Sequence, residues 1–160
     1  MAHNICIKIG NIMGEIPSGK HKDEIDLLSW HWGLTQTASS HVGSGGGSGT
    51  ANVHDLTITK YVDKASPTLV QECFYASDQK EAVLTVMKAS GENALEFVKI
   101  FMSGTVIISS VETGDPLPND MYKETVTINF SHVKFEYKVQ TASQSEGATS
   151  VGELVINDRS

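Results

Sequence analysis

The segment Glu24–Gly33 (EIDLLSWHWG) constrains the fold of this chain more than any other stretch. Successive side chains of a β-strand point to opposite faces, so Ile25 and Leu27 share one face while Trp30 and Trp32 share the other. A strand with one packed face can change that face only where an extra residue is inserted. The segment therefore predicts a β-bulge next to Leu27. The apolar residues expected on the packed face beyond it are Leu28, Trp30, Trp32 and Leu34.

A second change of packed face occurs within Tyr122–Val139. Val126, Ile128 and Phe130 share one face, whereas the apolar residues after Ser131–His132 alternate in the opposite register. This pattern predicts a second bulge or a sharp corner at Ser131–His132. Long strands that change their buried face curl a sheet into a barrel or turn a corner. The expected fold class is mainly β, a small closed β-barrel of about eight strands with one short flanking α-helix.

The helix is expected at Ser66–Ala76. Ser66 can cap its N-terminus, and Pro67 suits the first helical position, where the missing N–H costs nothing. Further along the chain, one glycine and two prolines predict a loop at Thr113–Asn119. The strands expected before this loop are Leu95–Met102 and Val106–Val111.

Length and charge limit the partners and the compartment. The chain is long enough for one domain, expected over residues 1–160 with a divergent, partly mobile tail at 140–160. Its net charge is −7 and it has no cluster of Lys and Arg, so nucleic acid is not expected as a partner. The first ten residues lack the pattern of a signal peptide, and no apolar run is long enough to span a bilayer. We therefore expect no membrane insertion.

The sequence offers no convincing pattern for catalysis, a cofactor or a metal. Gly14–His21 (GEIPSGKH) approaches the phosphate-binding G-x-x-x-x-G-K-[ST] motif, but histidine replaces the last hydroxyl residue and no helix is expected to follow. The six histidines include no pair at i, i+4 helical spacing, and the two cysteines, Cys6 and Cys73, are expected to be buried and unpaired. Glu24 and Asp26 are expected to form a solvated face. We therefore expect no enzyme, no catalytic residue, no cofactor and no metal.

A glycine-dense loop at His41–Asn52 is longer than the usual hairpin connection of about 2–5 residues. Such a loop is typical of a flexible contact arm or of a disordered linker, and its composition does not separate the two.

Several segments, in order, resemble the haemolysin co-regulated protein (Hcp) family of bacterial type VI secretion systems. The resemblance covers about residues 5–137 and is carried by IKIG at 7–10, EIDLLSWHWG at 24–33, the glycine-rich loop, HDLTITKYVDKASP at 54–67, and GEN followed by LEF at 91–97. It implies a β-barrel with one helix that assembles as a homohexameric ring. Rings would stack into a tube that a contractile sheath expels, tipped by a spike protein, with effector proteins carried in the lumen. It also implies no catalysis or cofactor, and a cytoplasmic protein secreted through the type VI machine without a signal peptide.

Two sets of residues are expected to act in this assembly. Ser29, His31 and Gly33 are expected to line the lumen and face effectors, because they alternate with Trp30 and Trp32. The tryptophans are expected to pack in the core rather than form an exposed stacking platform. The glycine-rich loop is expected to reach the adjacent ring. Its residues are Val42, Gly43, Ser44, Gly45, Gly46, Gly47, Ser48, Gly49 and Thr50.

The alternative is a monomeric β-barrel that binds a small apolar ligand. It would need a roomy interior. The tryptophans, with Phe130 and Phe135, are sufficient to fill a small barrel, which favours the ring. The native mass would decide between the two.

Overall fold

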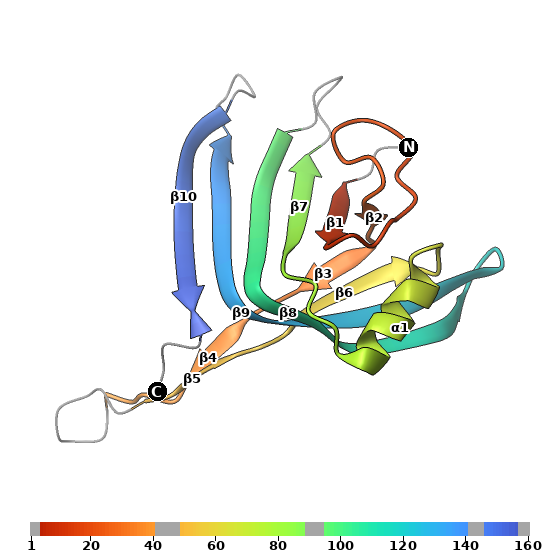
Figure 1. The fold of residues 1–160 in the computed structure, drawn as a ribbon. Helices are drawn as coiled ribbons and strands as arrows, with labels where there is room; N and C mark the ends of the chain where they lie inside the picture. The colour runs from red at the N-terminus through yellow and green to blue at the C-terminus, as the bar shows by residue number, and fades with distance from the viewer. Residues whose placement is uncertain (1–3, 41–48, 89–94, 141–145, 157–160) are drawn as a thin grey trace.

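The computed structural model of the chain describes residues 4–40, 49–88, 95–140 and 146–156, which form one bent sheet, a projecting hairpin and a helix (Figure 1). The elements in chain order are β1 (Ile5–Ile9), β2 (Ile25–Asp26), β3 (Ser29–His31), β4 (Leu34–Gln36), β5 (Ala51–Val53), β6 (Leu56–Tyr61), α1 (Ser66–Tyr75), β7 (Ala82–Lys88), β8 (Leu95–Leu117), β9 (Met121–Gln140) and β10 (Glu146–Val155).

The main sheet has the strand order β2-β1-β7-β8-β9-β6-β3, and β10 pairs with β9. Every pair is antiparallel, and β4 and β5 form a separate two-stranded sheet. The expected mainly β class with one helix is confirmed. The ladder of paired strands ends in β2 and β3 rather than returning to its first strand, so the expected closed barrel is not confirmed.

The first change of face is a change of partner strand. The Leu27 N–H donates to Ile5 O of β1 at 2.9 Å, and the next N–H, of Leu28, donates to Thr59 O of β6 at 2.7 Å. The chain thus leaves one end of the ladder and joins the other within one residue, instead of bulging inside one strand pair. Leu28 and Leu34 are 39% and 47% exposed, so the expectation that they share the packed face is wrong.

The second change of face is a corner shared by the two long strands, which both curve strongly (Figure 1). Ser103 pairs with His132 and Val106 with Phe130, so β8 carries an extra residue opposite Ser131. Gly104 supplies the positive φ of +77° that the corner needs. The predicted corner at Ser131–His132 is confirmed. The two strands expected before Thr113 are a single strand, β8, because Gly104 bends the chain without breaking the ladder.

Helix α1 packs against β8 and buries Leu69 in the core. The predicted helix is confirmed, but its N-cap is Ala65, which makes no side-chain cap hydrogen bond. The predicted capping role of Ser66 is wrong, because its hydroxyl accepts the Asp63 N–H and donates to a buried carboxylate.

Two regions expected to be irregular are strands. The predicted loop Thr113–Asn119 belongs to β8 as far as Leu117, and the turn occupies only residues 118–120, where Asn119 and Asp120 have positive φ. The tail, expected to be partly mobile over residues 140–160, forms β10 from Glu146 onward along β9. Pairing with β9 satisfies its backbone groups despite its weakly apolar sequence.

Candidate functional site

The β4–β5 hairpin projects beyond the main sheet, on the side away from α1 (Figure 1). All three residues of β4 are exposed, whereas on β5 Ala51 and Val53 are half-buried and Val53 packs against the core at the base of the hairpin. Beyond the paired strands, the Thr50 N–H donates to Thr37 Oγ1 at 2.8 Å and the Thr37 N–H donates to Thr50 O at 3.2 Å. A Cβ at Gly49 would overlap Gln36 and Ala38, so only glycine fits there. Of the predicted stacking loop, Gly49 and Thr50 therefore lie at the far end of the hairpin, and residues 42–48 lie outside the described residues.

The predicted lumen residues belong to β3 and the step that follows it. Ser29 and His31 are exposed, and Gly33 is half-buried. Directly opposite residues of paired strands share a face, which extends this surface across β6 and β9. We call it the hydroxyl face, because five of its six side chains carry a hydroxyl group. Its residues are Ser29, His31, Thr57, Thr59, Thr125 and Thr127.

The opposite side of the same strand is anchored by aromatic packing. Trp30 and Trp32 are half-buried against the core, as predicted. The Trp32 ring centroid lies 6.2 Å from that of Phe130 and 6.2 Å from that of Phe135, with which it stacks. Its Nε1–H donates to His54 O at 3.0 Å. These contacts hold β3 with its polar side chains turned outward.

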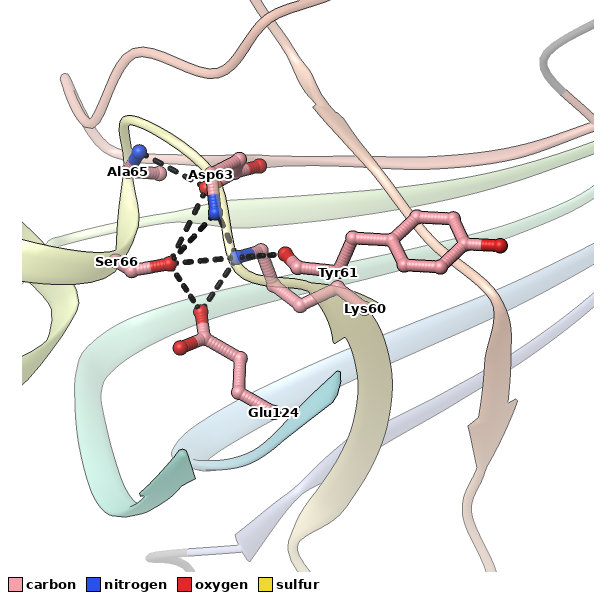
Figure 2. A network of polar contacts seen from close by, with 6 residues as sticks. All are labelled: Lys60, Tyr61, Asp63, Ala65, Ser66 and Glu124. Carbon is pink, nitrogen blue, oxygen red and sulfur yellow. Dashed lines mark hydrogen bonds and ion pairs between the residues drawn. The ribbon is translucent and has the colours of Figure 1, made fainter. Parts of the chain in front are cut away.

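A buried network of polar side chains joins β6, β9 and the start of α1 (Figure 2). Lys60 and Glu124 are both fully buried, and Lys60 Nζ donates to Glu124 Oε1 at 2.5 Å. The ammonium also donates to Asp63 Oδ1 at 2.9 Å and to Tyr61 O at 2.8 Å. Ser66 Oγ donates to the same Glu124 oxygen at 2.7 Å. Because a buried charge is costly unless it is paired, the network fixes the helix start on the sheet.

A second polar cluster surrounds His21, in the loop between β1 and β2. His21 Nδ1 lies 2.7 Å from Glu24 Oε2, and Nε2 lies 2.6 Å from Glu96 Oε1. Lys20 and Lys99 also pair with Glu96, at 3.2 and 3.1 Å. Burial raises the pKa of Glu96, but the hydrogen bonds from His21, Lys99 and Lys20 outweigh it and lower the pKa to about 2. The Glu24 side chain is only 14% exposed, so the expectation that it lies on a solvated face is wrong.

The thiol of Cys6 adjoins this cluster. Cys6 and Cys73 are free, as expected, and Cys6 is fully buried whereas Cys73 is half-buried. Burial, followed by the nearby Glu24 carboxylate, raises the pKa of the Cys6 thiol far above its usual range. Ligand atoms of Cys6, His21 and Glu24 all lie within 4.8 Å of one another. Sequence spacing could not reveal this group, because Cys6 is distant along the chain from His21 and Glu24 and meets them only when β1 pairs with β2.

A family described as "Type VI secretion system effector, Hcp" matches residues 6–137. The chain belongs to the Hcp family. Protein hcp1 of Pseudomonas aeruginosa is 44% identical to it over 142 residues, covering 89% of this chain and 87% of that protein. The solved structure of Hcp1 from Salmonella typhimurium is similar, with a TM-score of 0.76, 33% identity, and 99% and 97% of the two chains covered. A type VI secretion system protein at 23% identity has a TM-score of 0.89, with 99% of each chain covered, and so shares the fold.

The resemblance to Hcp expected from the sequence is thus confirmed, and the chain is a structural tube subunit of the type VI secretion system. Hcp is a family of secreted structural proteins rather than of enzymes. Within the part of the chain that the structure describes, no helix is long and apolar enough to cross a membrane.

One Hcp-like segment, HDLTITKYVDKASP, contains most of the buried network. Lys60 shares its strand parity with Leu56 and Ile58, and all three are buried. Glu124 shares its parity with the buried Val126 and pairs directly with Lys60. The sequence did contain a signal for this ion pair, namely one charged residue at a core-facing position on each of two strands. Sequence reasoning missed it.

Proposed function

We propose that this Hcp chain closes into homohexameric rings, which stack into the expelled tube and carry effector proteins in the lumen. The observation that carries the proposal is the projecting β4–β5 hairpin. A two-stranded hairpin is at best marginally stable in water without a further packing surface. A subunit of the adjacent ring supplies that surface, in a head-to-tail contact that repeats along the tube.

The finer architecture is also proposed. β2 and β3 are consecutive in the chain, so the two ends of the ladder are joined through Leu27 and Leu28 by the peptide chain itself. This junction closes the sheet of each subunit into a barrel. The barrel belongs to one domain, which spans residues 1–160. The contractile sheath, the spike protein and the effectors are the partners outside the ring. The subunit acts without catalysis, starts in the cytoplasm and leaves through the type VI machine.

Native mass spectrometry of the purified chain tests ring formation. We expect the six-fold mass to dominate at micromolar concentration, and electron-microscope class averages to show six-fold rings. The alternative, a monomeric barrel with a small apolar ligand, predicts a single-chain mass at every concentration together with saturable binding of an apolar probe. The interior is filled by one cluster of packed apolar side chains, which favours the ring.

The hydroxyl face is proposed to line the lumen. Its threonines and serine offer an uncharged polar surface, which neither repels nor tightly binds a passing protein. Replacement of His31 by glutamate should therefore reduce effector retention by the ring while leaving the hexamer intact, because it adds a negative charge to each subunit. Co-purification of a tagged effector measures retention. Gln71→Glu on α1, an exposed site with the same charge change, is the control and should retain the effector. Unchanged retention by the His31 variant would remove this face from the lumen.

A further inference from the structure

Three side chains of the types that bind zinc converge beside β1. Cys6 belongs to β1, and His21 and Glu24 belong to the loop that precedes β2, with their ligand atoms within 4.8 Å of one another. Zinc bonds of about 2.0–2.3 Å in a tetrahedral site place ligand atoms roughly 3.2–3.8 Å apart. The 2.7 Å contact between His21 Nδ1 and Glu24 Oε2 would have to open by about 0.5 Å to accept the ion. The side chains of His21 and Glu24 are 13% and 14% exposed, so an ion can enter from the surface.

A carboxylate already contacts the other ring nitrogen of the histidine. Glu96 Oε1 lies 2.6 Å from His21 Nε2, and Glu96 is itself held by Lys20 and Lys99. Histidines that bind zinc usually donate their other ring N–H to a carboxylate, which fixes the tautomer and the ring orientation. A proton on Nε2 leaves the Nδ1 lone pair directed toward Glu24.

We propose that Cys6, His21 and Glu24 bind one Zn²⁺ ion per chain, with Glu96 as a positioning residue for His21. The ion replaces the proton of the thiol, and the ring Nδ1 binds it through its lone pair. The thiolate and the carboxylate then balance its two positive charges. A sulfur, nitrogen and oxygen ligand set suits zinc rather than magnesium or calcium, which prefer oxygen alone. The three ligands leave a fourth position for water and tie the loop to β1.

Titration of the metal-free full-length protein with Co²⁺, followed by displacement with Zn²⁺, tests the proposal. Tetrahedral cobalt bound by a thiolate gives a sulfur-to-metal charge-transfer band that histidine and carboxylate sites lack. We expect one Co²⁺ per chain with this band, its loss in Cys6→Ser, and its retention in the matched control Cys73→Ser. Glu96→Gln should keep the band but weaken metal affinity about 10–100-fold.

His21→Gln and Glu24→Gln test ligation independently of the fully buried cysteine, should Cys6→Ser fold poorly. Each should weaken cobalt affinity at least as much as Glu96→Gln, with the circular dichroism spectrum unchanged. Cobalt binding without the thiolate band, or with a band that survives Cys6→Ser, would place the ion elsewhere on the protein. Either result, or no binding at all, would overturn the proposal and leave the cluster as an ion-pair network.

Discussion

Replacement of Lys60 by methionine should lower the free energy of unfolding by about 3–5 kcal/mol, the usual cost of leaving one partner of a buried ion pair alone. Lys60 and Glu124 are both inaccessible to solvent, and the Asp63 side chain is only 8% exposed. Without the ammonium, two carboxylates remain in the interior with no cation paired to them in the described part of the chain. Glu124 Oε2 already has no hydrogen-bond partner among the described residues, so this carboxylate has little to compensate the loss.

Denaturant unfolding at a fixed chain concentration measures this effect, because assembly makes apparent stability depend on concentration. The matched control is the double variant Lys60→Met/Glu124→Leu, which removes both charges and keeps the volume apolar. It should recover a large part of the lost stability, since a packed apolar pair often replaces a buried ion pair at little cost. A Lys60→Met protein within about 1 kcal/mol of the parent would show that water reaches this network.

Deletion of Gly43–Gly49 should abolish tubes while leaving single rings. The deleted residues lie between β4 and β5, so the deletion shortens the projecting end of the hairpin without touching the main sheet or its core. Electron microscopy should show isolated rings, and native mass spectrometry should still give the six-fold mass. Tubes that still form would reduce this segment to a linker, the other function that its composition allows.

Matched point variants separate hairpin contacts from a general effect of added charge. Leu34 on β4 and Val70 on α1 are both 47% exposed. Leu34→Asp should shorten or remove the tubes, because it places a charge on the hairpin where apolar contact with the next subunit is proposed. Val70→Asp makes a similar change on the helix and should leave tube length unaffected. Equal behaviour of the two variants would contradict a specific role for the hairpin.

The two changes of strand face could be predicted from the sequence because each depends only on residues that are neighbours in the chain. The alternation around Leu27 and around Ser131 follows from the two-residue period of a strand, and both positions proved to be turning points of the sheet. The helix could be predicted for the same reason, since Pro67 and the spacing of the apolar residues after it are signals that lie within the helix itself. The family could be recognised because its motifs are contiguous segments of the sequence, and residues 6–137 match it.

The strands with which those elements pair could not be predicted from the sequence. No local pattern says that the N–H of Leu28 bonds to β6 rather than to β1, because pairing depends on strands distant in the chain. The polar composition of the tail predicts a mobile segment, yet β9 offers an unpaired edge to which it adds as β10. An edge strand is stabilised by backbone hydrogen bonds, which leave little trace in side-chain composition.

By itself, the sequence determined the mainly β class, the single helix, the corner at Ser131–His132 and membership of the Hcp family, but not whether the sheet closes into a barrel. Only the tertiary structure decided which charged groups meet. Lys60 meets Glu124 because β6 and β9 pair in one register, and His21 meets Glu96 because the loop before β2 folds over the start of β8. Electrostatic contacts act over a few ångströms in space whatever the separation in the chain, so they follow from the fold rather than predict it.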